Sequence, residues 1–169
     1  MSLSKLGLPG ARTGIVIANE EVIRYFSNMT AITSLAPAGL GAEIVSQLIT
    51  DDALLPLCHD LIQPFYKKRS ELAVKLLRDA VSDSRLHIHQ PEGSMFLWLW
   101  FEGLGITTSE LYQRLKKKGL LIVPGKYFFP GQGVASEHAE SCVRMNYVQD
   151  ESELVRGIDI LASELKSAW

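Results

Sequence analysis

The chain has 169 residues, of which 47% are hydrophobic, and its formal net charge is -2 at pH 7. This is enough material for one well-buried core of roughly 150 residues, and the near balance of charge argues against a nucleic-acid partner. No apolar run approaches the roughly 20 residues of a membrane-spanning helix, and no secretion signal opens the sequence. We therefore expect a globular, cytoplasmic protein that does not bind membranes.

The cysteines and histidines do not form a metal-binding pattern. Cys58 and Cys142 are the only cysteines and lie far apart in sequence, which excludes a disulfide scaffold and argues against structural zinc. His87 and His89 alternate with apolar residues, so they share one face of a predicted strand. Such a pair can contribute to a metal site, but no third ligand follows nearby, and exposed strand histidines are the simpler interpretation.

The opening stretch, from Ser2 to Gly14, places one lysine among hydroxyls and glycines, with an arginine seven residues later. The ε-amino group of Lys5 can form a Schiff base with an aldehyde cofactor, while hydroxyls and a guanidinium can hold the phosphate of that cofactor. This combination indicates pyridoxal 5'-phosphate as a candidate cofactor. An ordinary solvated turn has the same composition, and the residues alone leave both interpretations open.

A strand and two helices are predicted next. The β-branched run at residues 15–18 predicts a strand. Apolar residues then recur at helical spacing over residues 20–33, and Asn19 can cap this helix. A second helical pattern covers residues 40–49 and ends at two aspartates.

A third, longer helix is predicted to follow. Asp52 can cap it, and apolar residues recur at helical spacing from Leu54 to Val81. Pro64 lacks the N–H that a helix interior needs, which predicts a kink or a division near Asp60.

The remainder of the chain alternates strands with helices. Strands are predicted at residues 86–89, 95–101, 120–123 and 142–148, and helices after Thr107 and Asp150, each followed three residues later by a glutamate as a capping box. The order strand, strand, helix, strand, strand, helix predicts a two-layer α/β sandwich, with helices over a mostly antiparallel sheet.

The side chains of two of these strands separate into faces. The segment 95–101 is apolar throughout, so we expect the sheet to be covered on both faces there. One face carries Leu97, Leu99 and Phe101, and the other carries Phe96, Trp98 and Trp100. In the last strand Val143, Met145 and Tyr147 should point to the core, while Arg144 and Asn146 face the other way.

The motif Ser2-x-Ser4-Lys5, followed by a Gly-rich turn and Arg12-x-Gly14, resembles the cofactor-lysine signature of fold-type I pyridoxal-phosphate-dependent aminotransferases. Three later segments also agree in order with that family: Pro91–Phe96, Val123–Gly125 and Val143–Tyr147. The resemblance covers the whole chain and is strongest to members that exchange an amino group between valine and pyruvate. The turn between lysine and arginine is one residue shorter than in much of the family.

The resemblance implies a domain organisation. Residues 1–50 would be the C-terminal tail of the large cofactor-binding domain, and residues 51–169 would be the small C-terminal domain with the interdomain helix. The chain would then be a C-terminal fragment of a longer parent. In the family, the acid that pairs with the pyridine nitrogen and the ring that stacks on the cofactor precede the lysine, so the fragment alone is expected to be inactive.

The resemblance also implies roles for individual residues. Lys5 would bind the cofactor covalently and move the proton at the substrate α-carbon, while Ser2, Ser4 and Arg12 would bind the phosphate. Arg144 would bind the substrate carboxylate, although an arginine on a strand is more often part of a surface ion pair. The parent would be a homodimer that transfers an amino group between a small aliphatic amino acid, of the valine or alanine type, and a 2-oxo acid such as pyruvate.

A second hypothesis is a non-catalytic aminotransferase-like module, such as the effector domain of a transcription regulator. That hypothesis requires an attached DNA-binding segment, and this sequence contains none. A third hypothesis is a bare structural α/β domain, in which Lys5 is an ordinary loop residue.

Overall fold

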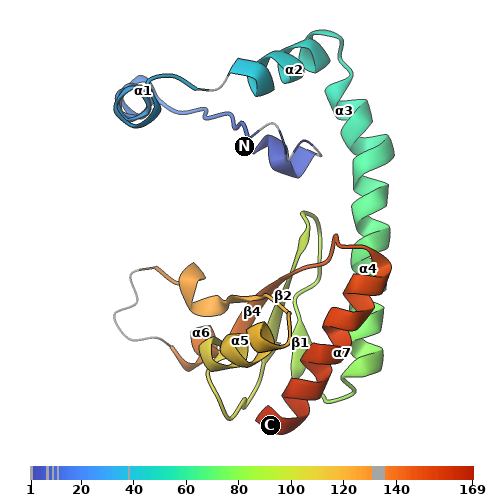
Figure 1. Ribbon diagram of the computed structural model, residues 1–169. Coiled ribbons are helices and arrows are strands. Elements are labelled where there is room, and N and C mark those ends of the chain that lie inside the picture. The colour runs from blue at the N-terminus through green and yellow to red at the C-terminus, as the bar shows by residue number, and fades with distance from the viewer. Residues whose placement is uncertain (1, 7, 9, 11, 38, 131–135) are drawn as a thin grey trace. The chain divides into compact units, whose positions relative to one another are not determined.

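The computed structural model describes residues 2–169, apart from residues 7, 9, 11, 38 and 131–135. The chain divides into two compact units, Met1–Phe65 and Tyr66–Trp169. Figure 1 shows that the first unit is helical and that the second contains the sheet. No helix among the described residues is long and apolar enough to cross a membrane.

The first unit contains the helices that the sequence predicts before residue 50. Its elements are the 3₁₀ turn η1 (Leu3–Leu6), α1 (Glu20–Ser34), α2 (Gly39–Thr50), α3 (Leu54–Pro56) and the π-helical segment η3 (Leu57–Ile62). The predicted N-cap of α1 is confirmed, because the Asn19 side chain accepts a hydrogen bond from the Val22 N–H at 2.9 Å. Among the described side chains of this unit, the buried hydrophobic ones are Leu3 and Val45.

The prediction of a strand at residues 15–18 is wrong. These residues belong to no strand, and the isolated bridge in this part of the chain joins Ser2 to Gly14. A β-branched run becomes a strand only where a neighbouring strand takes its backbone hydrogen bonds. The described residues of the first unit supply no such neighbour.

Asp52 ends one helix and does not begin the next. It has φ 50, in the left-handed region, and its N–H donates to the Ile49 carbonyl at 3.1 Å, while the Ala53 N–H donates to the Leu48 carbonyl at 2.9 Å. These bonds satisfy the last carbonyls of α2, which is the usual role of a left-handed residue after a helix. The N-cap of α3 is Ala53, which has no capping side chain.

The interruption predicted near Asp60 is confirmed. Helical backbone continues from Leu54, but residues 57–62 are π-helical, and the Gln63 N–H donates to the Cys58 carbonyl five residues back. Pro64 has no N–H with which to continue the α-helical ladder. The wider π-helical turn before Pro64 accommodates the missing hydrogen bond, and the helical backbone continues.

The second unit contains a four-stranded antiparallel sheet with the strand order β1-β2-β4-β3. The strands are β1 (Leu86–Ile88), β2 (Phe96–Phe101), β3 (Val123–Pro124) and β4 (Cys142–Asn146), and the helices are α4 (Gln63–Ala80), α5 (Thr108–Lys117), α6 (Glu137–Ser141) and α7 (Glu151–Ala168), with the 3₁₀ turn η4 (Gly125–Phe128). The predicted order of strands and helices is confirmed, with α6 and η4 as additions.

Helices cover one face of this sheet. Leu97, Leu99 and Phe101 of β2 are at most 1% exposed. They pack with Val143 and Met145 of β4 and with apolar residues of three helices: Ala73 and Leu77 of α4, Leu111 and Leu115 of α5, and Leu154, Ile158, Leu161 and Leu165 of α7. The predicted apolar stripe of the final helix is therefore confirmed, and the core of the second unit lies between the helical layer and the sheet.

The opposite face of β2 is less deeply buried, so the predicted cover of both faces is confirmed only in part there. Phe96, Trp98 and Trp100 are each partly exposed. On this side the sheet is partly covered by η4 and α6, through Phe128 against Trp98 and His138 against Trp100. Aromatic rings stabilise one another across such a partly open face, which a run of aliphatic side chains would not do as well.

Helix α5 has the limits that the sequence predicts. The Thr107 side chain accepts a hydrogen bond from the Glu110 N–H, but the Glu110 carboxylate pairs with Arg114 at 2.8 Å, so only half of the capping box forms. At the other end Gly119 has φ 83, and the N–H groups of Gly119 and Leu120 donate to the last turn of the helix. Leu120 is therefore part of the helix end, and the strand predicted from residue 120 begins only at Val123.

The final helix begins where the sequence predicts, without the predicted side-chain cap. Asp150 is the N-cap residue of α7, but its carboxylate makes no capping hydrogen bond. Glu153 pairs with Arg156 at 2.7 Å, so it does not complete a capping box. The carboxylates of Glu151 and Glu153 lie in the first turn, where the helix dipole favours negative charge.

Candidate functional site

The lysine motif lies in a loop that closes on itself. Lys5 lies within η1, and the Leu3 N–H donates to the Thr13 carbonyl at 3.1 Å, next to the bridge between Ser2 and Gly14. Leu3 is buried, which anchors the turn. The motif residues before the lysine and those after the arginine are therefore neighbours in space, although they are about a dozen residues apart in sequence.

The candidate phosphate ligands on this loop differ in accessibility. Ser2 and Arg12 are exposed, whereas Ser4 is 8% exposed. Arg12 has φ 47, a left-handed backbone conformation that residues other than glycine adopt infrequently. The side chain of Lys5 and residues 7, 9 and 11 of the turn lie outside the described part. An exposed hydroxyl and an exposed guanidinium on adjoining parts of one loop are suitable ligands for a phosphate.

Arg144 lies on the partly open face of the sheet. It is on β4, with Trp98 of β2 and Val123 of β3 as its cross-strand partners. Its guanidinium carbon is 4.1 Å from the ring centroid of Phe96 and 4.7 Å from that of Phe128. Both distances are within the range of cation–π attraction.

The charge of Arg144 has no partner of opposite sign in the described part of the chain. The Nε atom is buried and makes no hydrogen bond to any described residue, and Arg144 is in none of the ion pairs found there. Among the described residues, Arg144 is therefore not part of a surface ion pair. A guanidinium held in this way can bind an external carboxylate with two parallel hydrogen bonds.

The two predicted parts of the site belong to different units. The loop with Lys5 and Arg12 is in the first unit, and Arg144 is in the second.

His87 has an ordinary structural role, and His89 is exposed beyond the end of β1. His87 Nε2 lies 2.8 Å from a Glu102 carboxylate oxygen, and the His87 ring stacks on Trp100 with centroids 4.5 Å apart. The described residues contain no group of three side chains that could hold a metal ion. Burial raises the pKa of the Cys142 thiol, which makes it a poor nucleophile at neutral pH.

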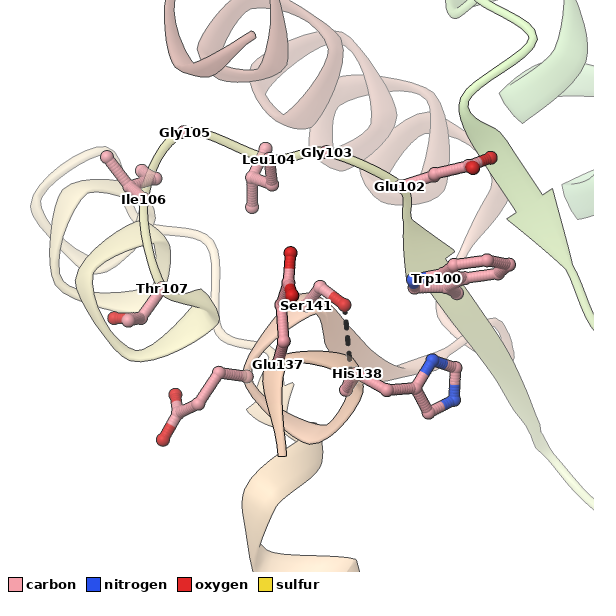
Figure 2. Close-up of a pocket in the computed structure, with 11 residues that line it drawn as sticks. Trp100, Glu102, Gly103, Leu104, Gly105, Ile106, Thr107, Glu137, His138 and Ser141 are labelled. Carbon is pink, nitrogen blue, oxygen red and sulfur yellow. Dashed lines mark hydrogen bonds between the residues drawn. The ribbon is translucent and has the colours of Figure 1, made fainter. Parts of the chain in front are cut away.

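A cavity of about 600 Å³ on the second unit has no counterpart in the sequence predictions. Figure 2 shows Trp100 and His138 on one side of it and the loop from Gly103 to Thr107 on the other, with the Ser141 hydroxyl donating to the His138 carbonyl at 3.0 Å. Arg144 is not among the described residues that line this cavity. The sequence feature that could have indicated this cavity is the glycine pair Gly103 and Gly105, but such pairs are too common in loops to indicate a pocket.

Comparison with known proteins agrees with the motif and the fold. The sequence pattern of the family described as aminotransferase class I and II matches residues 1–161. The chain belongs to this family. The valine–pyruvate aminotransferase of Escherichia coli is 48% identical over 169 residues, which is all of this chain and 40% of that protein. The aromatic-amino-acid aminotransferase 1 of Thermococcus litoralis is 27% identical over 98% of this chain and 38% of its own length.

Solved structures of aminotransferases have the same fold as this chain. The crystal structure of valine-pyruvate aminotransferase from Salmonella typhimurium is 49% identical and superposes with a TM-score of 0.90, over 100% of this chain and 44% of that chain. The predicted α/β class, with a mostly antiparallel sheet as in the C-terminal part of an aminotransferase, is confirmed. This aminotransferase chain spans about two fifths of the length of the curated relatives that it matches.

Proposed function

We propose that this chain is the part of a pyridoxal-phosphate-dependent aminotransferase that carries the cofactor lysine and the arginine for the substrate carboxylate. The proposed reaction transfers an amino group between a small aliphatic amino acid, of the valine or alanine type, and a 2-oxo acid such as pyruvate. The observation that carries the proposal is Arg144, whose guanidinium lies against two aromatic rings and has no ion-pair partner in the described part of the chain. The choice of substrates rests on the 48% identity to the valine–pyruvate enzyme.

The loop around Lys5 fits the cofactor through its phosphate. Ser2 and Arg12 would bind that group, since both are exposed on one closed loop, and Ser4 is the weaker candidate because it is buried. When bound, pyridoxal phosphate supplies an aldehyde that receives the amino group and a ring that accepts the electrons released at the substrate α-carbon. Lys5 would bind the cofactor and, when free, move the proton at that carbon.

Arg144 would orient both substrates. Amino acids and 2-oxo acids both carry a carboxylate next to the reacting carbon, so one guanidinium serves both halves of the reaction. Two parallel hydrogen bonds fix the direction of the carboxylate and hence that of the adjacent carbon, and such positioning lowers the activation barrier.

We further propose that the whole protein is a cytoplasmic homodimer, as the family resemblance implies.

The test uses a full-length protein that carries this chain. Borohydride reduction followed by peptide mass mapping should find a pyridoxyl group on Lys5, and an assay with valine and pyruvate should show alanine formation. An adduct on Lys5 without transamination of any amino acid would favour the non-catalytic effector module. Transamination with the adduct on another lysine would contradict the assignment of Lys5.

A further inference from the structure

We propose that Phe96 and Phe128 form an aromatic clamp that positions the guanidinium of Arg144 for the substrate carboxylate. The clamp is defined by these three residues, which come from β2, η4 and β4. The proposal rests on the proposed function, because it assumes that Arg144 binds substrate. It adds two positioning residues that no motif in the sequence marks for this role.

The clamp replaces the polar partners that an arginine normally has. The guanidinium carbon of Arg144 lies 4.1 Å from the Phe96 centroid and 4.7 Å from the Phe128 centroid, and its Nε has no hydrogen-bond partner among the described residues. An arginine side chain has large rotamer entropy, so it needs something to hold it. Two ring contacts hold the cation without using the N–H groups of the fork that a carboxylate needs.

Phe96 is held in place by the end of β4. The Tyr147 N–H donates to the Met95 carbonyl at 3.3 Å, and the Tyr147 hydroxyl donates to the Ser94 carbonyl at 2.5 Å. Tyr147 is 1% exposed, so these bonds are protected from water. The residues before Phe96 are thereby fixed to the strand that carries Arg144.

Phe128 is held in place by a tightly packed turn. A Cβ atom at Gly125, the first residue of η4, would lie 2.6 Å from the Cys142 Cβ atom and 2.9 Å from the Ala139 carbonyl oxygen. Only glycine permits this approach, which seats η4 directly against β4 and α6. The Trp98 ring supports Phe128 on the same face of the sheet, with an edge-on contact at 5.4 Å between centroids.

The first test measures steady-state kinetics of the full-length protein with Phe128→Leu and Phe96→Leu. Each should raise KM for valine and for pyruvate by about 3- to 30-fold with little change in kcat, as expected when a cation–π contact that aids binding is removed. A general loss of folded enzyme would lower the apparent kcat and leave KM unchanged. Phe128→Tyr retains the ring and should behave like the wild type.

Phe129→Leu is the matched control. Phe129 is the next residue in the chain, and its ring centroid lies 6.2 Å from that of Trp98 and 6.0 Å from that of His138. In the described part of the chain, the rings under the Arg144 guanidinium are those of Phe96 and Phe128. The KM values of Phe129→Leu should stay near those of the wild type. Equal effects of Phe128→Leu and Phe129→Leu would overturn the clamp, because they would indicate a general disturbance of the turn.

A second readout does not depend on activity. In NMR spectra of the 169-residue chain, the Hε proton of Arg144 should be shielded by the rings, and Phe128→Leu should move it downfield, whereas Phe129→Leu should not. No movement with Phe128→Leu would overturn the clamp.

If Arg144→Lys left the activity unchanged, the substrate site in the proposed function would fail. If Arg144→Lys impaired activity while Phe128→Leu did not, the clamp alone would fail.

Discussion

At the scale of single residues, Arg144 shows how environment decides the role of a charged side chain. The same residue type on a strand is usually an exposed ion pair, which contributes roughly 0–1 kcal/mol. Here the guanidinium lies against Phe96 and Phe128, and its Nε is buried. These rings are far from Arg144 in sequence, so the sequence could indicate the arginine through its motif but not the contacts that hold it.

Arg144→Lys in the full-length protein should reduce kcat/KM for valine and pyruvate roughly 30- to 150-fold, equivalent to about 2–3 kcal/mol. Lysine keeps the charge but loses the planar fork that makes two hydrogen bonds to a carboxylate. Arg156→Lys is the matched control, because Arg156 is exposed and pairs with Glu153 on the surface of α7. Near-normal efficiency of Arg144→Lys would contradict the assignment of the substrate site.

The two cysteines should differ in reactivity. Cys142 is fully buried and burial raises the pKa of its thiol, whereas Cys58 is half-buried. A raised pKa means less thiolate at any pH below it, and thiolate is the reactive form. Iodoacetamide at pH 8 should therefore label Cys58 first in the native chain, as measured by mass spectrometry. Equal labelling rates under native conditions, with the fold intact by circular dichroism, would contradict the burial of Cys142.

At the scale of elements, local signals predicted helices better than strands. Asn19 and Thr107 cap their helices as the sequence indicates, because a cap is a contact between residues three apart. Residues 15–18 have strand propensity but form no strand, since a strand depends on partners elsewhere in the chain. The sequence predicts a strand from Leu120 because its side chain is apolar. The backbone hydrogen bond by which Leu120 closes the end of α5 leaves no signal in the sequence.

Gly125→Ala should destabilise the second unit. The added Cβ would lie within 3 Å of Cys142 and Ala139, so the turn or the strand must move. Overpacking of this kind typically costs about 1–3 kcal/mol, and a lower midpoint of thermal unfolding in calorimetry would show it. Gly93→Ala is the control, since nothing lies within 4 Å of a Cβ there and its φ is not left-handed. Equal midpoints for the two variants would contradict the close packing of η4.

At the scale of the whole molecule, the two units differ in the amount of buried core. The second unit buries apolar side chains from β2, β4 and three helices, whereas Leu3 and Val45 are the buried hydrophobic side chains described in the first. No residue of α1 is buried, and Phe26 and Met29 are at least half exposed. Local stability follows the amount of buried apolar contact.

Amide hydrogen exchange should therefore be slower in the core of the second unit than in the first unit. Amides of β2 and β4 are expected to exchange slowest, because they open only when the core of the second unit unfolds. Amides of α1 and α2 should exchange much faster in the same sample. Mass spectrometry of peptides from a monomeric preparation would measure both. Equal protection of α1 and β2 would show that the first unit is more stable than its burial indicates.

Cofactor binding by the 169-residue chain should be weak. Its described loop offers Ser2, Ser4 and Arg12 to a phosphate, and the chain spans about two fifths of the length of its curated relatives. Any lysine forms a reversible adduct with an aldehyde, so a specific site must bind tighter than a free lysine peptide does. Titration with pyridoxal phosphate, followed by visible absorbance, should show no difference between the chain and a peptide of residues 2–14. Tight stoichiometric binding that Arg12→Ala abolishes would instead show that this loop forms a complete phosphate site.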